Sequence, residues 1–522
     1  MKTLEIFDTT LRDGAQTEGI SFSVSDKLSI ARTLDEFGIR YIEGGNPGSN
    51  PKDMEFFKSI DSKSLKNATL VAFGSTKRKG VAVETDENVI SLLEANTPSV
   101  AIFGKAWDLH VSEILRTTLK ENLDCVEETV RFFKDKGKEV IFDAEHFFDG
   151  YKDNPEYAIE VLRAAESGGA DVLVLCDTNG GVLPTQVYRA VKTVCDYFPG
   201  MRIGIHCHND TGCAVANSLI AVKAGACHVQ GTFAGIGERC GNADLSVIIP
   251  NLQIKDEYLC VENGLEKLSE TVIRISEISN LSVPSNKPYV GESAFAHKGG
   301  MHIDGVDKLS KSFEHIDPSL VGNSRRFLLS EVSGRKAVLL KIRKFEPELT
   351  KDSPETKIIL DTLKELEYEG YQFEAAEASF ELLVKKITGK FKPHFELNMY
   401  KATSENPAPE GEQNSIAMVK IMVDGNAETT ASPGNGPVNA LDLALRKALS
   451  VFYPQLSDVQ LIDYKVRVLE TDQTTESRVR VLIESTDKNS SWATVGVSTD
   501  IIEASFIALV DSLEYKLYKE KL

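Results

Sequence analysis

Short apolar runs, each followed by a helix-like segment, recur at intervals of roughly 30 to 35 residues through the first half of the chain. Eight such units in about 250 residues are typical of a closed (β/α)8 TIM barrel. An open, doubly wound sheet is the alternative, but it favours Gly-x-Gly-x-x-Gly after the first strand, where Arg12-Asp13-Gly14 stands instead. The predicted strands lie near residues 4–7, 41–43, 70–73, 100–103, 140–142, 172–175, 203–205 and 228–231.

The rest of the chain departs from this rhythm. At 522 residues the chain exceeds what one core usually supports. We predict an α/β barrel over 1–285, helical linker subdomains that contribute to the active site over 286–389, and a C-terminal α+β regulatory or dimerisation domain over 390–522. A weak internal repeat, in which two strands, a small-residue loop and an amphipathic helix follow one another, indicates two ββα units in the last domain.

Charge and composition exclude several classes of partner. The formal net charge of -19 opposes non-specific attraction to nucleic acid or to anionic lipid. No apolar run approaches the roughly 20 residues that span a bilayer, and charge comes too early in the sequence for a signal peptide. The eight cysteines include no Cys-x-x-Cys pair, which favours reduced thiols. We therefore expect a cytoplasmic protein without a nucleic-acid or membrane partner.

Polar residues gather directly after the predicted strands, which is where parallel barrels carry their catalytic groups. His206 and His208 are two residues apart, so on a strand they point to the same side, and Asp13 can add a carboxylate from the first strand. Two imidazoles and a carboxylate suit a divalent cation, with Mg²⁺, Mn²⁺ and Zn²⁺ all chemically possible. Cys207 should point away from this set. The alternative is a strand that merely ends in two hydrogen-bonded histidines.

Two further charged groups have a structural and a functional interpretation. Arg12 could form a simple ion pair with Asp13, or it could polarise a carbonyl oxygen. Glu145 could be a solvated loop carboxylate, or it could act as a general base in the partly buried mouth of the barrel.

With these residues assembled, the chain resembles the family of 2-isopropylmalate, homocitrate and citramalate synthases, most closely its citramalate synthase branch. The resemblance implies that Asp13, His206 and His208 bind the metal, with Asn242 as a direct or water-mediated ligand. Arg12 and Thr178 would hold a 2-oxo acid. The segments that carry the resemblance are Asp8-Thr-Thr-Leu-Arg-Asp-Gly14, Gly44-Gly-Asn-Pro-Gly-Ser-Asn50, Glu145-His-Phe-Phe-Asp-Gly-Tyr-Lys152, His206-Cys-His-Asn-Asp-Thr-Gly212, Gly235-Ile-Gly-Glu-Arg-Cys-Gly-Asn242 and His297-Lys-Gly-Gly-Met-His302.

The resemblance also carries expectations for the linker and for regulation. Glu145 would take part in acid/base chemistry, and His302 and Asp304 would lie over a barrel mouth, often that of the partner subunit, which implies a homodimer. Phe313 stands where some relatives carry a tyrosine, so a phenolic proton donor or substrate contact is absent at that point. The family uses its last domain for feedback by a branched-chain amino acid, and isoleucine would fit this branch.

The implied reaction condenses acetyl-CoA with pyruvate and hydrolyses the thioester to citramalate and CoA, on a route to isoleucine through 2-oxobutanoate. The basic stretch Lys77-Arg78-Lys79 is a candidate for the CoA phosphates, although such a triplet is more often a solvated loop. The alternatives are a 2-isopropylmalate synthase that accepts 2-oxoisovalerate, a carbon-carbon lyase on the same barrel, and a non-catalytic amino-acid sensor. The sensor is disfavoured because Arg12, Asp13, Glu145, His206 and His208 are all present.

Overall fold

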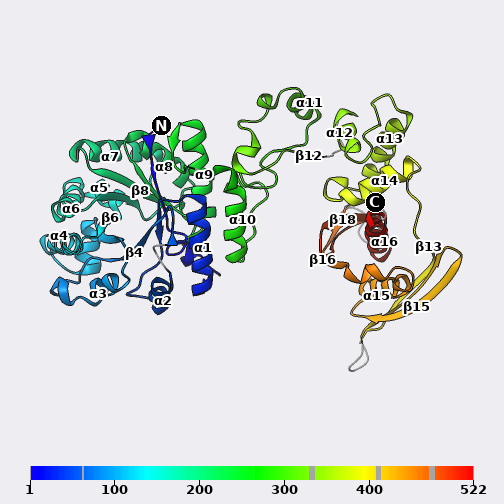
Figure 1. Ribbon diagram of the computed structural model, residues 1–522, viewed down its shortest axis with the longest axis horizontal. Helices are drawn as coiled ribbons and strands as arrows, with labels where there is room; N and C mark the ends of the chain where they lie inside the picture. Colours follow the sequence, from blue (N-terminus) through cyan, green and yellow to red (C-terminus); the bar gives the residue numbers. More distant parts are fainter. Residues whose placement is uncertain are drawn as a thin grey trace. The chain divides into compact units, whose positions relative to one another are not determined.

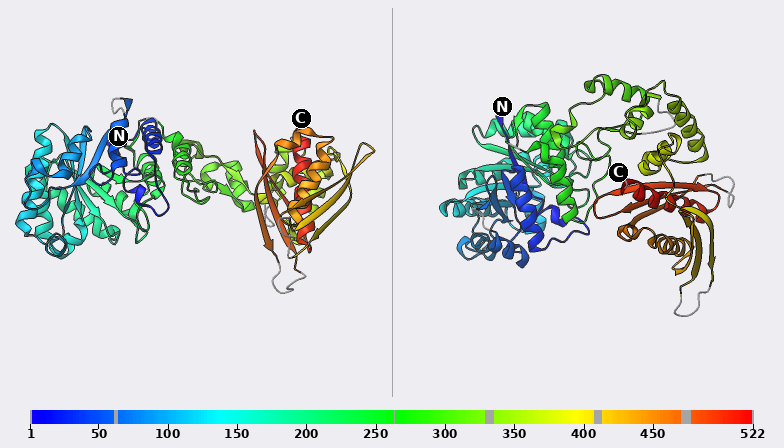
Figure 2. Two further views of the ribbon diagram at one scale, coloured as in Figure 1. Left: turned by 90° about the horizontal axis from the view of Figure 1, so that it is seen from below. Right: turned by 45° about the vertical axis from the view of Figure 1, so that its right-hand side comes forward.

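The computed structural model describes residues 2–60, 64–262, 264–328, 335–406, 413–469 and 477–520 (Figures 1 and 2). The chain divides into two compact units. The first comprises Met1–Phe295 and Ile316–Arg325, and the second comprises Ala296–His315 and Arg326–Leu522. The three-domain division drawn from the sequence stays a prediction. Within the part of the chain that is described, no helix is long and apolar enough to cross a membrane.

The first unit is a closed barrel of eight parallel strands, which confirms the predicted fold (Figure 1, blue to green). Each strand pairs with the next, and the last pairs with the first. The strands are β2 (Glu5–Asp8), β3 (Tyr41–Glu43), β4 (Thr69–Ser75), β5 (Ser99–Lys105), β6 (Glu139–Glu145), β7 (Val172–Asp177), β8 (Arg202–Cys207) and β9 (His228–Gly231). The principal helices between and after them are α1 (Val24–Phe37), α2 (Pro51–Ser59), α3 (Glu87–Glu94), α4 (Leu119–Asp135), α6 (Pro155–Gly168), α7 (Pro184–Tyr197), α8 (Ala214–Ala224), α9 (Leu245–Pro250) and α10 (Leu268–Ile278).

Alternation along the strands separates an inner core from an outer one. Phe7, Tyr41, Val71 and Ile141 belong to a cluster inside the barrel, whereas their strand neighbours pack against the surrounding helices. Cys207 belongs to the outer core, as expected for a residue between two inward-facing histidines.

The amino-terminal end of the barrel is closed by a polar network. Arg202 donates to Glu5 and to Glu139, at 2.8 Å each, and the Tyr41 hydroxyl donates to Glu139 at 3.0 Å. The candidate active site lies at the opposite, carboxyl end of the barrel, where His206 stands near the end of β8.

The second unit begins with short elements and helices. These are β11 (Ala296–His297), α11 (Gly300–Lys308), β12 (Arg326–Phe327), α12 (Arg335–Phe345), α13 (Pro354–Glu369) and α14 (Glu377–Ile387). An apolar core that includes Ile342, Ile359, Phe373 and Phe380 holds the last three helices together.

The C-terminal repeat is present, but each half holds three strands rather than the expected two. The first half is an antiparallel sheet of β13 (Glu396–Ser404), β14 (Ser415–Val423) and β15 (Asn426–Gly434), followed by α15 (Pro437–Ser450). The second is an antiparallel sheet of β16 (Gln460–Val468), β17 (Val479–Thr486) and β18 (Ser491–Ser498), followed by α16 (Ile501–Glu520). The two helices touch each other and lie between the sheets (Figure 2, left).

Candidate active site

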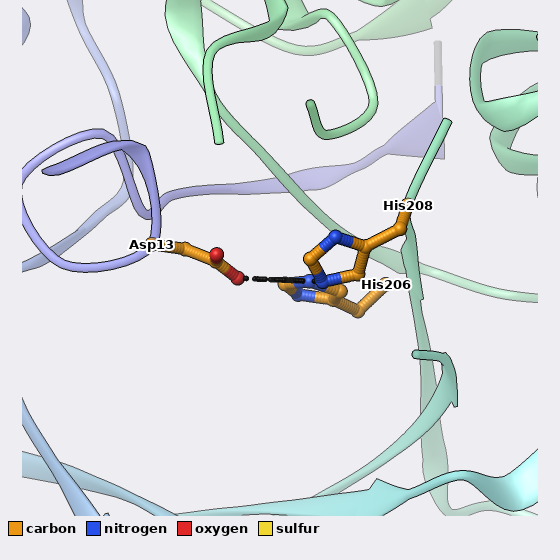
Figure 3. Close-up of side chains that lie close together, drawn as sticks. All are labelled: Asp13, His206 and His208. Carbon is orange, nitrogen blue, oxygen red and sulfur yellow. Dashed lines mark ion pairs between the residues drawn. The ribbon is translucent and has the colours of Figure 1, made fainter. Parts of the chain in front are cut away.

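Three buried side chains converge at the carboxyl end of the barrel (Figure 3). Asp13 Oδ2 lies 3.3 Å from His206 Nε2 and 3.7 Å from His208 Nε2. One ligand atom from each of the three lies within 4.8 Å of the others, which is the spacing of a metal-binding group. The turn after β2 places Asp13, because its backbone N–H donates to Thr9 Oγ1 at 3.3 Å and also to the Thr9 carbonyl.

Electrostatics prepare these groups to act as ligands. Burial alone would raise the pKa of Asp13, but Arg12 and the two histidines hold it well below its usual range. Burial lowers the pKa of His208 to about 4, and neighbouring His206 acts in the same direction. Burial opposes protonation of His206 too, but Asp13 outweighs it and raises the pKa of that ring. Asp13 therefore remains a carboxylate and His208 a neutral imidazole at physiological pH.

Asn242, the fourth predicted ligand, lies beside His208. Its backbone forms a β-bridge with His208, and its Oδ1 is buried without a hydrogen-bond partner among the described residues. A buried oxygen of this kind is costly unless something binds it. Two imidazole nitrogens, a carboxylate and a carboxamide oxygen form a donor set that fits a divalent cation.

Arg12 is held beside this group by two carboxylates. Its Nε donates to Glu43 Oε2 at 2.6 Å, and its Nη1 lies 3.1 Å from Asp13 Oδ2. The guanidinium also lies over the Phe73 ring, 3.8 Å from its centroid. Burial opposes the charge, but Glu43 and Asp13 raise the pKa of Arg12 overall, so it remains a cation. Glu43, the last residue of the short buried strand β3, was not among the predicted site residues.

Thr178 and Glu145 stand at the ends of neighbouring strands. Thr178 Oγ1 accepts a hydrogen bond of 2.9 Å from the His146 backbone N–H, which leaves the hydroxyl proton of Thr178 free to donate. Glu145 is the last residue of β6 rather than part of a loop, and it forms an ion pair with Lys105, its register partner on β5. Lys105 was also missed, although it comes two residues after the predicted strand 100–103 and is the last residue of β5.

These groups line one cavity of about 270 Å³. Its aromatic wall is formed by Phe73 and Phe103, whose rings stack at 5.1 Å with an angle of 19° between their planes. Arg239 lies at the rim, where it donates to both Asp210 oxygens and to the Thr178 carbonyl. The lining residues are Arg12, Asp13, Gln16, Phe73, Phe103, Asp143, Glu145, Cys176, Thr178, His206, His208, Glu238 and Arg239.

A second cavity, of about 480 Å³, shares Phe103 with the first and is lined by the basic stretch 77–79. Lys77 pairs with Glu128 at 3.0 Å, and Lys79 donates to the carbonyls of Leu115 and Arg116. Two of the three basic residues therefore also fix the surrounding loops.

The predicted linker residues belong to the second unit. The His302 ring stacks on Phe313, with centroids 4.2 Å apart, so the phenylalanine at the tyrosine position supports the histidine ring. Asp304 pairs with Lys308 at 2.6 Å, one helical turn further along α11. His302 and Asp304 both lie on α11 and are at least partly exposed.

Three family models match successive parts of the chain. An HMGL-like model matches residues 3–278, a model described as homocitrate synthase post-HMGL domain-like matches 289–370, and the LeuA allosteric (dimerisation) domain matches 374–517. The chain is 54% identical to the (R)-citramalate synthase of Aquifex aeolicus over 517 residues, which cover 99% of this chain and 98% of that protein.

The chain belongs to the (R)-citramalate synthase family. A second relative, the (R)-citramalate synthase of Geobacter sulfurreducens, is 50% identical over 522 residues, which cover 100% of this chain and 99% of that protein. A probable 2-isopropylmalate synthase of Methanopyrus kandleri is more distant, at 34% identity over 97% of each chain. The resemblance drawn from the sequence motifs is thus confirmed, down to the branch.

Proposed function

We propose that the chain condenses acetyl-CoA with pyruvate and hydrolyses the resulting thioester, so that acetyl-CoA, pyruvate and water give (R)-citramalate and CoA. The observation that carries this proposal is one small cavity that holds the Asp13, His206 and His208 cluster, the charged Arg12 and an aromatic wall. The identity of the full-length relatives supports the same reaction.

Asp13, His206, His208 and Asn242 would hold a divalent cation (Mg²⁺, Mn²⁺ or Zn²⁺), whose chemistry there is that of a Lewis acid toward carbonyl and carboxylate oxygens. Arg12 donates toward the 2-oxo oxygen as negative charge develops on it, from a position already fixed by Glu43. The free hydroxyl proton of Thr178 is available for the substrate carboxylate.

Glu145 is the proposed base that removes a methyl proton from acetyl-CoA. It lines the cavity, and the ion pair with Lys105 keeps it oriented at the end of β6. The new carbon-carbon bond forms at the carbonyl carbon of pyruvate, and water then cleaves the thioester to release CoA. His302 and Asp304 are proposed to act over a barrel mouth in a homodimer, a state that the match to a dimerisation domain supports.

The aromatic wall favours pyruvate over 2-oxo acids with branched tails. Phe73 is fixed by Arg12 on one side and Phe103 on the other, so it has little freedom to make room. Pyruvate presents one methyl group, whereas 2-oxoisovalerate presents an isopropyl group. Each extra methyl or methylene group in such a pocket is worth about 1 to 3 kcal/mol in discrimination.

Acetyl-CoA is proposed to extend into the neighbouring cavity of about 480 Å³. Arg78 is the basic residue there that remains most available, since its side chain is 69% exposed and its ion pair with Glu87 is long, at 3.9 Å. Arg78→Glu should raise the KM for acetyl-CoA and leave that for pyruvate unchanged. Equal KM values for acetyl-CoA in the variant and the wild type would place the CoA phosphates elsewhere.

The last domain is the proposed site of feedback inhibition by isoleucine. A cavity of about 470 Å³ lies next to the start of α15. Asp442, whose Oδ1 accepts from Arg446 at 2.7 Å, is the proposed partner of the ammonium group through its other oxygen. Val438, Leu461 and Leu509 offer apolar surface for a branched side chain. The match to an allosteric domain supports a regulatory role, and the identity of the effector is our inference.

The test of the function follows CoA thiol release from acetyl-CoA with pyruvate, 2-oxoisovalerate or 2-oxoglutarate, each with and without a chelator. We expect release with pyruvate alone, and we expect the chelator to stop it. CoA release only with 2-oxoisovalerate would show that the substrate is not pyruvate but the substrate of 2-isopropylmalate synthases. CoA release that persists with a chelator that strips tightly bound ions would show that the reaction does not need a metal ion.

A further inference from the structure

A chain of buried hydrogen bonds runs behind His206, on the side of the ring away from Asp13. His206 Nδ1 lies 2.9 Å from Gln230 Oε1, and Gln230 Nε2 donates to Asp143 Oδ1 at 3.0 Å. The exposed fractions of His206, Gln230 and Asp143 are 5%, 0% and 3%, so all three side chains are buried. None of the roles assigned above to the site residues uses Gln230 or Asp143.

Only the closed barrel brings these three side chains together. His206 of β8 and Gln230 of β9 are register partners, so their side chains point to the same inner side. Asp143 comes from β6, which is separated from β9 by two other strands in the barrel order. Gln230 therefore reaches across the interior of the barrel, from the back of His206 to a carboxylate on another wall.

The chemistry of the three groups determines which atom donates in each of these hydrogen bonds. The amide nitrogen of Gln230 is the donor toward Asp143, whose Oδ1 accepts. The amide oxygen must then face His206, and this oxygen also only accepts. His206 Nδ1 is therefore the donor in its bond, and the proton-free electron pair needed to bind a metal is left on Nε2, the atom that faces Asp13.

His208 lacks a comparable restraint. Its Nδ1 is buried and has no hydrogen-bond partner among the residues that the structure describes. The two histidines of the cluster are therefore not equivalent, because only the Nδ1 of His206 has a hydrogen-bond partner among the described residues.

We infer that Gln230 is a positioning residue for the metal site, that it fixes the tautomer and orientation of His206, and that Asp143 fixes Gln230 in turn. This inference rests on the proposed use of a metal ion. Hydrogen-bond partners behind a ligating histidine typically contribute about 10- to 100-fold to metal affinity.

The test titrates the metal-stripped, full-length chain with Mn²⁺ and reads the free ion by electron paramagnetic resonance. Gln230→Met keeps the length of the side chain and removes both hydrogen bonds, and we expect its Kd for Mn²⁺ to rise about 10- to 100-fold. Asp143→Leu should have a similar effect. Asp143→Asn should restore a Kd close to that of the wild type, because its side-chain oxygen can still accept from Gln230.

The control is Asn217→Leu, which removes another fully buried amide of the first unit. Asn217 donates to the Val182 carbonyl at 2.7 Å and makes no hydrogen bond to the cluster, so its loss should leave the Kd for Mn²⁺ unchanged. If Gln230→Met does not fold, the Asp143 pair carries the test. Wild-type affinity for Mn²⁺ in both Gln230→Met and Asp143→Leu would show that Gln230 does not position His206, while the metal site itself would stand. If the wild-type chain binds no Mn²⁺, both the proposed metal site and the positioning role of Gln230 would be wrong.

Discussion

Arg12 has both a structural and a catalytic interpretation, and the structure suggests how to separate them. The side chain is 12% exposed and holds two carboxylates, Glu43 and Asp13, of which the Glu43 side chain is fully buried. Arg12→Met would leave Glu43 without its cation inside the barrel. Loss of one partner of a buried pair costs about 3 to 5 kcal/mol in the free energy of unfolding.

The catalytic cost should be separable from this loss. Removal of a single donor to a developing oxyanion typically lowers kcat by about 10² to 10³. In Arg12→Met we therefore expect both losses. In the double variant Arg12→Met, Glu43→Gln, the buried negative charge of Glu43 is gone, so much of the stability should return while kcat stays low. Arg12→Lys keeps the charge but not the planar fork, and it should retain stability better than activity.

The measurement combines denaturant unfolding with CoA release at saturating Mn²⁺ and pyruvate, so that altered metal affinity does not enter kcat. If the double variant recovered both stability and turnover, Arg12 would be a structural ion pair and nothing more. Wild-type turnover in Arg12→Lys would likewise refute the argument from the geometry of the guanidinium.

Three further predictions concern the pocket wall, the barrel base and the last domain. Phe103→Ala should lower the preference of kcat/KM for pyruvate over 2-oxoisovalerate by at least about 10-fold, and an unchanged ratio would mean that another residue sets pocket size. At the base, burial opposes ionisation of Glu5, but its hydrogen bond with His228 and the charge of Arg202 lower its pKa overall. A lowered folded pKa stabilises the protein above the ordinary pKa, and this contribution is lost as the pH falls through the folded value. The stability difference between Arg202→Met and the wild type, measured by urea unfolding, should therefore be larger at pH 7 than at pH 3, and a constant difference would contradict the network. Truncation after residue 389 should abolish isoleucine inhibition of CoA release, and Asp442→Asn should weaken it in the full chain; inhibition that survives truncation would remove the effector from this domain.

Local periodicity accounts for what the sequence predicted well. Inward and outward residues alternate along each barrel strand, so the strands and the paired orientation of His206 and His208 follow from short-range pattern alone. Asp13 was found for a similar reason, because it directly follows the first strand. The candidate metal cluster thus consists of residues whose positions are fixed within a few residues of a strand end.

Residues whose role depends on pairing between distant strands were missed. Glu43 ends a strand of only three residues, and Gln230 lies inside a short strand that reads as structural. Their significance appears only when the barrel closes, since Glu43 meets Arg12 across 31 residues and Gln230 meets Asp143 across 87. No local pattern encodes such contacts.

Two strands of the C-terminal repeat were not predicted for a different reason. Glu396–Ser404 and Gln460–Val468 are almost entirely exposed or half-buried along their length, on both faces. A strand without a buried face carries no apolar alternation of period two. By contrast, Ser415–Val423 buries every second residue, which gives the alternation of period two.

The central claim is that Asp13, His206 and His208 form the metal site on which pyruvate turnover depends. Its most direct test is pyruvate-dependent CoA release by His208→Ala beside the wild type, with circular dichroism to show that both are folded. We predict no detectable release by a folded variant, together with the loss of tight Mn²⁺ binding. A near-normal rate in His208→Ala would contradict the account, because it would show that the two histidines end a strand without a role in turnover.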